Sequence, residues 1–531
     1  MDYNAIDWLL SLLPMLAVLG LMVGRGWKAS QAGFVGWLAA VLLAVGRFGA
    51  GLDALGYAQI KALILTVDVL LIIWAALVLY YVVERAGALT VIADNLSSLS
   101  ADPLVQVLLL GWVFTSFLQG VGGFGVPVAI VAPLLVGLGI SQVRAVVIPS
   151  VGHGWAVTFG SLAASFVMLI NTTGRAGEDL VSPPAIMLGV LAYVSGLMIA
   201  HVLDGWRGVR RAIPFVLVAG TVMAVVQYLL AISGLWTLGT IGAGLAGLVV
   251  SVLWIRRGQR TSTNAELGPA QPADNKATPA SSANPRPRPT LRLALAGYTI
   301  LVVLAVLMRG VAPVKGTLNR WALEIDLPET TTDRDWTVEE EQDEGFGIPG
   351  HPGLIIFYSS GIAYILYRRR KLYAPGVGRD ILKQSGQRAW KSGLGVLMMV
   401  AIASTMGRAG MTEIIADGLS ESIPGSLYAF VAPVIGAIGA FVTGSNTNSN
   451  AVFGMLQLNT AEMLGVSVAT ILGAQTASGA VASVLAPAKV TVGCSTVDAN
   501  EGVVLRWLLG YGALLVALVG VMTWIGVVVL D

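Results

Sequence analysis

The chain repeats a short pattern within strongly apolar sequence, and this repeat constrains the fold more than any other feature. Arg85-Ala86-Gly87, followed by Ile92-Ala93-Asp94 and Leu96, recurs as Arg408-Ala409-Gly410, Ile415-Ala416-Asp417 and Leu419, at a constant offset of 323 residues. A polar, glycine-rich break follows each copy, at 119–125 and at 444–450, and each break leads on to a Gly-x-Ser, at 139–141 and 465–467. Two related halves that meet at broken helices are typical of membrane transporters.

Composition fixes the class of protein. Of the 531 residues, 56% are hydrophobic and only 12% are charged, which is more apolar sequence than a soluble core can bury. We therefore expect an all-α polytopic membrane protein. The single cysteine, Cys494, argues against a disulfide framework and against a cysteine-based metal site, so no cofactor is expected.

Apolar stretches of about 20 residues predict the membrane spans. Twelve candidates lie near 5–23, 32–50, 60–83, 143–170, 184–203, 212–232, 235–255, 291–313, 351–367, 391–406, 467–497 and 503–529. Two further stretches, 103–141 and 425–465, are interrupted midway by the polar breaks, and we predict that each forms a re-entrant hairpin.

These spans predict eight regions along the chain. They are N-terminal helices (1–59), a first repeat with its hairpin (60–203), connecting helices (204–256), a disordered cytoplasmic linker (257–290), a single span (291–313), an acidic extracytoplasmic segment (314–350), a span with a basic loop (351–390) and a second repeat with its hairpin (391–531).

Loop charge predicts the orientation, since short cytoplasmic loops are enriched in Lys and Arg. Basic clusters at 25–28, 207–211, 256–260 and 368–371 all fall on one side, which we assign to the cytoplasm. The segment 314–350 carries ten acidic and three basic residues and falls on the other side. Both termini are then expected to be extracytoplasmic.

The same count places the two copies of the repeat in opposite orientation, so we predict an inverted repeat with one hairpin entering from each face. The span after each hairpin has its own small polar interruption, predicted at Gly152-His153-Gly154 and at Thr476-Ala477-Ser478-Gly479. Unwound backbone at membrane depth requires protein or a water-filled cavity around it. The four breaks therefore predict a site near the midplane and transport by movement of this unit past a scaffold, as in an elevator.

Three stretches resemble the lactate permease family. They are Gly122-Gly123-Phe124-Gly125-Val126-Pro127-Val128-Ala129-Ile130 with its continuation to Gly139, Thr443-Gly444-Ser445-Asn446-Thr447-Asn448-Ser449-Asn450, and Asp68-Val69-Leu70-Leu71-Ile72-Ile73-Trp74. The resemblance covers most of the chain outside the linker and the acidic segment. It implies uptake of lactate or a related 2-hydroxy monocarboxylate such as glycolate, usually with protons, across the plasma membrane (the inner membrane of a bacterium). It also implies the fold of the ion transporter superfamily, commonly in an elevator homodimer.

The chain departs from the family pattern at the hairpin tips. Gln119 and Asn446 stand where the family typically has carboxylates, which leaves coupling to Na+ as an alternative to H+. His153 and Lys489 make the expected site more electropositive. This favours, as an alternative substrate, another small organic anion such as a sulfonate or a dicarboxylate.

The tips are also suited to an anion on physical grounds, because helices that restart after Gly125 and Asn450 offer free N–H groups and the positive end of a helix dipole. Glycines allow close approach of the backbone, and hydroxyl and amide groups supply further contacts. The candidate substrate-binding residues are Gln119, Gly120, Gly122, Gly123, Gly125, Ser445, Asn446, Thr447, Asn448, Ser449, Asn450, Thr476, Ser478 and Lys489. The candidate ion-coupling residues are His153, Asp68, Asn446 and Asn448.

Structural alternatives remain for the ionisable candidates. Lys489 either binds a substrate carboxylate or extends to an interface, and His153 either carries a proton or is a hydrogen-bonded histidine at a helix break. Asp68 aligns with Lys391 in the repeat and could be a structural acid. A membrane enzyme or receptor is a remote alternative, because no nucleophile–base pair, nucleotide loop or metal-spaced ligand set is present. The expected partners are a small organic anion, the lipid bilayer and a second copy of the chain, with no nucleic acid.

Overall fold

A computed structural model describes residues 3–100, 102–123, 125–262, 287–318, 322–323, 326–342 and 346–530. These residues are mostly helical, and twelve of their helices are long and apolar enough to cross a membrane, which confirms the predicted all-α polytopic class. The centre of the predicted linker, 263–286, lies outside the described residues, as do Asp343 and Glu344 of the acidic segment.

The twelve helices are not the twelve predicted spans. Two helices predicted as arms of hairpins, Pro103–Val121 and Gly425–Thr443, are among the twelve candidate membrane-spanning helices. The predicted span at 351–367 forms the helix Pro352–Arg369, which is not among them. The segment Ser182–Ile232 is one of the twelve, but it consists of two helical arms. The arms are separated where Asp204 and Gly205 leave the helical conformation. The arms run antiparallel, since the Tyr193 hydroxyl lies 2.8 Å from the Thr221 hydroxyl and the earlier Ser182 hydroxyl lies 3.5 Å from the later Tyr228 hydroxyl. They match the two predicted spans 184–203 and 212–232.

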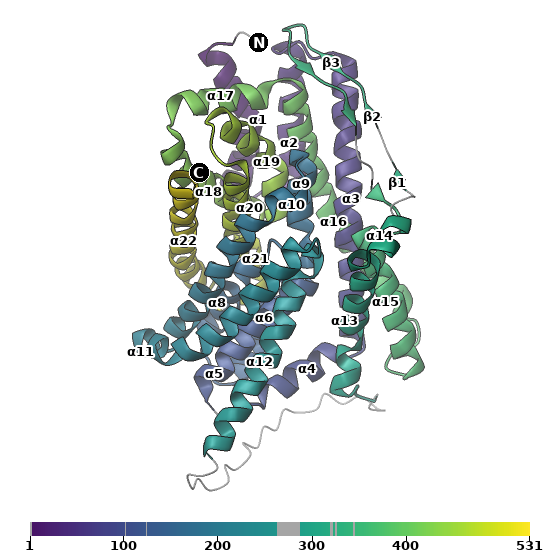
Figure 1. Cartoon of the computed structure of the whole chain (residues 1–531), viewed down its shortest axis with the longest axis vertical. Coiled ribbons are helices and arrows are strands. Elements are labelled where there is room, and N and C mark those ends of the chain that lie inside the picture. Colours follow the sequence, from purple (N-terminus) through teal and green to yellow (C-terminus); the bar gives the residue numbers. More distant parts are fainter. Residues whose placement is uncertain are drawn as a thin grey trace.

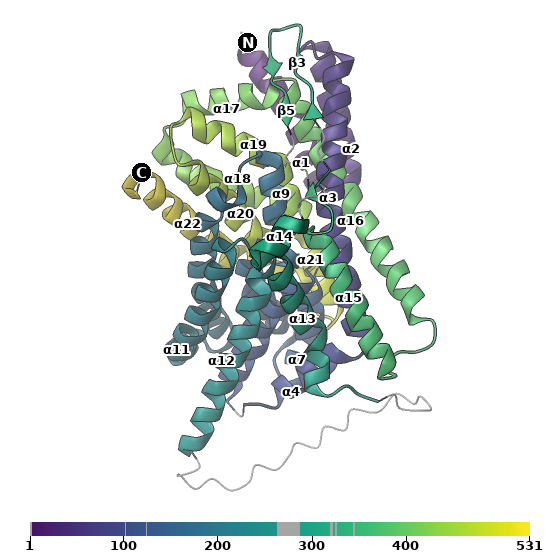
Figure 2. The same cartoon turned by 45° about the vertical axis from the view of Figure 1, so that its right-hand side comes forward.

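Two long helices form the upright part of the molecule. α3 (Leu52–Arg85) has 34 residues and α16 (Val377–Arg408) has 32, and they lie side by side along most of the height of the molecule (Figures 1 and 2). α1 (Ala5–Arg25) and α2 (Ala29–Gly46) pack beside them. A Cβ on Gly33 of α2 would lie 2.7 Å from the Met398 Cβ, so the small residue is what lets α2 approach α16.

The repeated sequence motif has the same local structure in both copies. α3 ends at Arg85, and Gly87, at φ +70°, starts α4 (Ala88–Ser97). α16 ends at Arg408, and Gly410, at φ +75°, starts α17 (Met411–Ser422). Glycine is needed at both turns because side chains disfavour positive φ. α4 lies at the lower end of the molecule and α17 at the upper end (Figures 1 and 2). This placement at opposite ends is what an inverted repeat requires. The inverted relationship of the two whole halves stays a prediction.

Each predicted break is a turn between two helical segments. In the first half, α5 (Pro103–Leu108), the π-helical η1 (Leu109–Phe114) and α6 (Thr115–Val121) run continuously to the break, and α7 (Val126–Gly137) follows it. In the second half, α18 (Gly425–Thr443) and α19 (Asn446–Met463) flank Gly444. Ser449 Oγ donates to the Gly436 carbonyl at 2.8 Å and Gln457 Nε2 to the Ala432 carbonyl at 3.0 Å, so these arms are antiparallel. That the hairpins are re-entrant stays a prediction.

The span after the first hairpin is broken over a longer stretch than predicted. α8 (Gln142–His153) is followed by the 3₁₀ turns η2 (Gly154–Ala156) and η3 (Ser161–Ala163) before α9 (Ala164–Thr173) resumes. The break therefore lies at 154–163 and includes only the last of the three residues predicted for it.

The break predicted at 476–479 is wrong, because these residues lie inside the continuous helix α20 (Val468–Val484). The helix ends instead before Pro487, which starts α21 (Pro487–Ser495). Proline lacks an N–H and disfavours helical conformation in the residue before it. Ser478 does not interrupt α20 because its hydroxyl donates to the Ala474 carbonyl within the same helix.

The remaining helices surround this centre. They are α10 (Gly177–Leu180), α11 (Ser182–Ile232), η4 (Trp236–Leu238), α12 (Gly239–Ser262), α13 (Leu291–Ala305), η5 (Val306–Gly310), α14 (Ala312–Leu318), α15 (Pro352–Arg369), α22 (Glu501–Ile525) and η6 (Gly526–Leu530).

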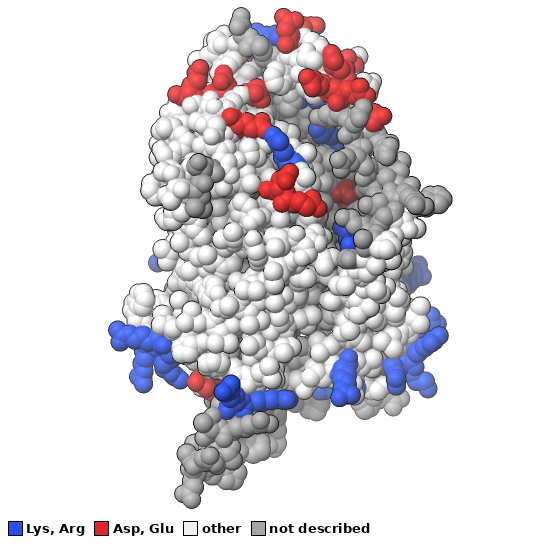
Figure 3. Space-filling view, in the orientation of Figure 1, with Lys and Arg blue, Asp and Glu red and all other residues white. Residues whose placement is uncertain are grey.

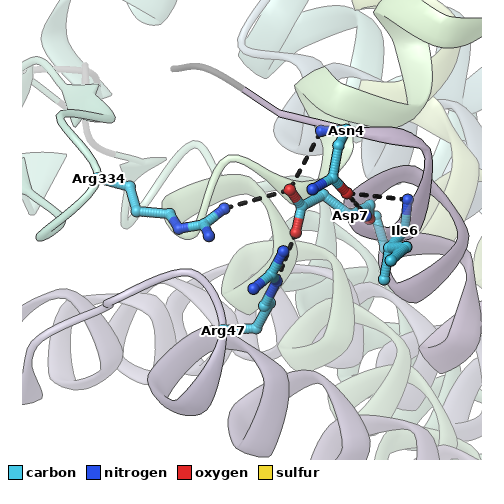
Figure 4. Close-up of polar contacts among 6 residues, drawn as sticks. Asn4, Ile6, Asp7, Arg47 and Arg334 are labelled. Carbon is cyan, nitrogen blue, oxygen red and sulfur yellow. Dashed lines mark hydrogen bonds and ion pairs between the residues drawn. The ribbon is translucent and has the colours of Figure 1, made fainter.

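The acidic segment forms short antiparallel strand pairs: β1 (Ala322–Leu323) with β6 (Phe346–Gly347), β2 (Asp326–Leu327) with β5 (Glu341–Gln342) and β3 (Thr330–Thr331) with β4 (Thr337–Val338). It is attached to the start of α1 through Asp7, whose carboxylate lies 2.6 Å from Arg47 Nε and 3.3 Å from Arg334 Nη1 (Figure 4). The Asp333 N–H also donates to the Gly49 carbonyl at 2.9 Å. The segment is therefore anchored to α1 and to the turn between α2 and α3.

Charge is distributed unevenly between the two ends. On the face in Figure 3, Asp and Glu gather at the end that carries the N-terminus and the strands, while Lys and Arg form a band near the other end. Both termini lie in the upper half of Figure 1. The assignment of the basic end to the cytoplasm stays a prediction.

Candidate functional site

The two hairpin tips meet at one cavity of about 630 Å³. Gln119, just before the first break, lies on one wall, and the second tip, from Thr443 to Asn448, lies on another. The broken segment of the first half contributes Val157 and Ser161, and the scaffold helices contribute Ile73 and Lys391. Segments that are far apart in the sequence therefore converge here.

A helix N-terminus faces this cavity. Ser445 is the N-cap of α19, and its hydroxyl accepts the Asn448 N–H at 3.2 Å. The unpaired N–H groups of a first helical turn and the positive end of the helix dipole both favour an anion. Asn446, Thr447 and Asn448 of the same turn line the cavity and add amide and hydroxyl groups.

The charged residues of the cavity are all lysines: Lys28, Lys391 and Lys489 line it, with no Asp or Glu. Within the described part of the chain, none of the three forms an ion pair. An excess of positive charge with no internal counter-ion attracts an anion into the cavity. Lys28 and Lys391 are exposed, as is Trp390 at 68%, so the cavity opens to the surface on their side.

The cavity wall includes a strained turn that begins at Ser161. Ser161, Leu162 and Ala163 have φ values of 47°, 59° and 62°, a left-handed conformation that costs non-glycine residues roughly 1–2 kcal/mol each. The turn is held to the first tip because the Gly123 N–H donates to Ser161 Oγ at 2.9 Å. A Cβ on Gly123 would lie 2.5 Å from that oxygen, so glycine is needed for this contact.

A buried polar cluster joins the second tip to both broken spans. Thr476 Oγ1 of α20 accepts from Asn446 Nδ2 at 3.2 Å and from Asn450 Nδ2 at 2.9 Å. Thr158, which lies in the break at 154–163, donates its hydroxyl to the Thr476 carbonyl at 3.0 Å. Asn450 Nδ2 also donates to the Ser165 carbonyl at 2.8 Å. These contacts fix the position of the α19 N-terminus in the cavity wall.

The predicted substrate-binding residues divide into two groups. Those that line the cavity are Gln119, Ser445, Asn446, Thr447, Asn448 and Lys489. Those that lie outside its lining are Gly120, Gly122, Gly123, Gly125, Ser449, Asn450, Thr476 and Ser478. Members of the second group support the wall from behind; a Cβ on Gly120, for example, would lie 2.8 Å from the Ile241 backbone nitrogen.

Sequence reasoning missed part of the lining, chiefly Lys28, Ser161, Ser165, Trp390, Lys391 and Ser392. A signal existed for Lys391, because it occupies the repeat position of Asp68. Lys28 predicts only the orientation of the chain, as part of the basic cluster at 25–28. Nothing local in the sequence distinguishes Ser161 and Ser165, which reach the cavity because the span breaks later than predicted.

The ion-coupling candidates do not share one place. Asn446 and Asn448 line the cavity. His153 is buried outside its lining, and its Nδ1 lies 2.5 Å from the Pro149 carbonyl within α8. Asp68 contacts Asn171 and His351 instead. Among the described residues, no group of three or more His, Cys, Asp or Glu side chains could hold a metal ion.

Comparison with known proteins identifies similar sequences over nearly the whole chain. A family model described as L-lactate permease matches residues 7–530. An L-lactate permease of Salmonella typhimurium is 26% identical over 471 residues, which cover 85% of this chain and 83% of that protein. A glycolate permease of Escherichia coli is 26% identical over 545 residues, covering 97% and 94%. Among solved structures, the YdaH transporter of Alcanivorax borkumensis is similar with a TM-score of 0.47 and 16% identity, over 92% of this chain and 88% of that one.

Proposed function

Because the chain belongs to the L-lactate permease family, we propose that it is a secondary transporter that carries L-lactate or glycolate across the plasma membrane. Relatives named L-lactate permease and glycolate permease align with 85% and 97% of the chain. The chain is a multi-pass membrane protein and a transporter. The proposed identity of its substrate rests on the names of these relatives and on the chemistry of the cavity.

One observation carries the proposal for the site: the cavity between the tips holds three lysines, one helix N-terminus and no carboxylate. A small carboxylate that leaves water needs charge and hydrogen-bond donors to replace its hydration. Lys489 supplies the charge beside the tips, and the first turn of α19 supplies backbone N–H groups. The Ser161 and Thr447 hydroxyls are suited to the 2-hydroxyl group of the substrate.

In this proposal the two hairpins and the broken spans move together past α3 and α16. The polar cluster around Thr476 favours such a unit, because it bonds α19 and α20 to the break of the first half. The strained turn at 161–163 keeps the first tip in place without a regular helix. A homodimer, with scaffold helices at its interface, completes this elevator scheme.

Proton coupling is the first choice for the driving ion, as the resemblance implies. Sodium coupling is the alternative, because the tips carry Gln119 and Asn446 in place of titratable carboxylates and amide oxygens suit a hard cation. A proton site in this chain then has to lie away from the tips.

The cavity also favours a second candidate substrate class. The three lysines carry more positive charge than one lactate anion can neutralise. The cavity volume of about 630 Å³ is also larger than so small a molecule needs. A dicarboxylate or a sulfonate of similar size would use the excess positive charge, with one group near Lys489 and another near Lys391.

Uptake by the purified protein in proteoliposomes tests this function. Radiolabelled L-lactate and glycolate are supplied with imposed gradients of H+ or Na+, and unlabelled dicarboxylates and sulfonates are added as competitors. The proposal requires lactate uptake that rises with one of the two gradients. If lactate is neither transported nor able to compete, while a dicarboxylate or sulfonate is transported, the second candidate replaces it.

A further inference from the structure

A buried carboxylate and imidazole lie together outside the cavity, between the scaffold and the first broken span. His351 Nε2 lies 2.5 Å from Asp68 Oδ1, and the two side chains are 2% and 13% exposed. Asn171 Nδ2 donates to the other oxygen, Asp68 Oδ2, also at 2.5 Å. Asp68 belongs to α3, His351 is the N-cap of α15 and Asn171 belongs to α9.

The hydrogen bonds of His351 define its protonation state. The Gly353 N–H donates to Nδ1 at 3.1 Å, so Nδ1 is an acceptor and carries no proton. The proton of the neutral ring is then on Nε2, from which it is donated to Asp68. Asp68 is therefore a carboxylate that accepts one bond from each side. Protonation of Nδ1 would break the N-cap of α15, which leaves Asp68 Oδ2 as the atom that can take up a proton without that loss.

Asp68 and His351 belong to two helices, α3 and α15, that pack closely against each other. α15 packs so closely on α3 that a Cβ on Gly353 would lie 2.9 Å from the Leu71 carbonyl carbon. Two other charged groups act near this pair: Arg309, at the end of η5, interacts electrostatically with both Asp68 and Glu178 of α10.

Asn171 belongs to the unit that carries the second tip, because α9 is bonded to α19 at both ends. Near its start, the Ser165 hydroxyl lies 3.1 Å from the Thr447 hydroxyl, and the Ser165 carbonyl accepts from Asn450. Just beyond its end, Arg175 forms an ion pair with Glu462. The bond between Asn171 and Asp68 is therefore a link between the scaffold and the unit that carries the second tip.

The link is also close to the cavity along both helices. Asp68 precedes the cavity-lining Ile73 by five residues of α3, which at 1.5 Å per residue is about 7.5 Å. Asn171 follows the cavity-lining Ser165 by six residues of α9, or about 9 Å. A change at Asp68 can reach the cavity through one and a half turns of either helix.

We propose that Asp68, oriented by His351, is the proton-coupling site, and that Asn171 transmits its protonation to the unit carrying the second tip. A hydronium ion transfers a proton to Asp68 Oδ2: one O–H bond of the hydronium breaks and releases water, and the new Oδ2–H bond converts the carboxylate into a carboxylic acid. Oδ2 then carries a hydrogen, so the strong charge-assisted bond from Asn171 is lost while Nε2–H of His351 still donates to Oδ1. Loss of this link releases α9 and the second tip from the scaffold. This inference rests on the proposed transport of lactate.

The test compares accumulation with exchange in proteoliposomes. A pH difference of one unit can drive about tenfold accumulation of a monoanion carried with one proton. Asp68→Asn keeps the shape of the side chain and one oxygen that can accept from His351 Nε2, but it cannot titrate. We expect it to abolish accumulation of radiolabelled lactate, to a ratio near one, while lactate counterflow at equal pH persists. Asp53→Asn, which changes an exposed acid of the same helix, is the matched control and should accumulate lactate as the unmodified chain does.

Asn171→Ala keeps the carboxylate and the imidazole and removes only the link. We expect accumulation to fall at least threefold with counterflow retained. Accumulation at the unmodified level in either Asp68→Asn or Asn171→Ala overturns the proposal, and if Asp68→Asn has no counterflow, Asn171→Ala decides. Absence of lactate counterflow in the unmodified chain would instead refute the proposed function, so the two failures are distinguishable.

Discussion

The Ser165 hydroxyl lies 3.1 Å from the Thr447 hydroxyl, although the two residues are 282 positions apart in the chain. Ser165 follows the break in the first half, and Thr447 lies in the first turn of the helix that starts at the second tip. Both residues line the cavity. The two halves thus meet through side chains at the place where the substrate is proposed to bind, and changes in either half should alter the same site.

Lys489 is one of the three lysines that line the proposed site, so its removal should weaken substrate binding. A charge-assisted hydrogen bond contributes about 1.5–3 kcal/mol, which corresponds to roughly a 10- to 100-fold change in affinity. We expect Lys489→Gln to raise the KM for lactate by at least tenfold in proteoliposome uptake. Lys383→Gln, at an exposed position of α16, should leave the KM unchanged. An unchanged KM in Lys489→Gln would exclude this lysine as the counter-charge.

The contact between Gly123 and Ser161 has no room for a methyl group. In Gly123→Ala the new Cβ would lie 2.5 Å from Ser161 Oγ and 3.0 Å from Gln119 Nε2, so the first tip or the strained turn must shift. We expect the maximal rate of lactate counterflow to fall at least tenfold. Gly137→Ala is the control, because nothing lies within 4 Å of the Cβ that it adds. An equal fall in the counterflow rate of both variants would show that the effect comes from helix packing in general and not from the contact with Ser161.

Thr476 stabilises the polar cluster behind the second tip, and Thr476→Val removes its hydroxyl at nearly constant volume. Asn450 Nδ2 then keeps only the Ser165 carbonyl as an acceptor, and one unsatisfied buried N–H costs about 1–3 kcal/mol. Asn446 Nδ2 still reaches the Thr158 hydroxyl and the Thr476 carbonyl. We expect a lower thermal midpoint in detergent and a slower counterflow rate. Thr299→Val, at an exposed position where the hydroxyl bonds only within its own helix, should change neither. An unchanged midpoint in Thr476→Val would show that the cluster does not contribute to stability.

Glu413 of α17 predicts a pH dependence of stability at the acidic end. Partial burial, together with the charges of Glu462 and Asp417, raises the pKa of its carboxyl above the ordinary value of 4.5. The folded protein therefore binds this proton more tightly than the unfolded chain does, and the ionised carboxylate destabilises the fold increasingly as pH rises from 4.5 through the raised pKa.

Glu413→Gln removes this cost and keeps an acceptor for Asn459, which donates to Glu413 at 2.7 Å. We expect its thermal midpoint to exceed that of the unmodified chain by about 1–2 °C at pH 8, with the difference vanishing near pH 4.5. Glu421→Gln, at an exposed position of the same helix, should show no such difference. A midpoint difference that is constant with pH would contradict the assignment to Glu413.

Sequence alone predicts the polytopic helical class and the two polar breaks, because each depends on local signals. Apolar length predicts the spans, and clusters of glycine and polar residues mark the breaks. The position of the second broken span was misjudged for a physical reason: polar side chains such as Ser478 can be satisfied within a helix, whereas Pro487 cannot donate a helical hydrogen bond.

The cavity is only partly predictable from sequence, because most of its wall comes from long-range packing. Gln119 and Asn446 were expected from their place in the breaks, and both line it. Lys28 and Lys391 enter it because α2 and α16 pack beside the tips. The sequence marks Lys391 only by its repeat alignment with Asp68, and nothing in the sequence places Lys28 at the site. The same holds for His351, which lies 283 positions from Asp68 and was assigned no role from the sequence.

Protection of a cavity residue by substrate tests the central claim most directly, namely that the anion binds between the two tips. Ser392 lines the cavity on α16, and the only native cysteine, Cys494, is buried and can be replaced by alanine. In the Cys494→Ala background, Ser392→Cys is treated with a water-soluble thiol reagent at increasing lactate concentration. Half-maximal protection should occur near the KM for lactate transport, and Lys489→Gln should shift it at least tenfold higher. A transport-active Ser392→Cys variant whose labelling rate is unchanged by saturating lactate would contradict the account.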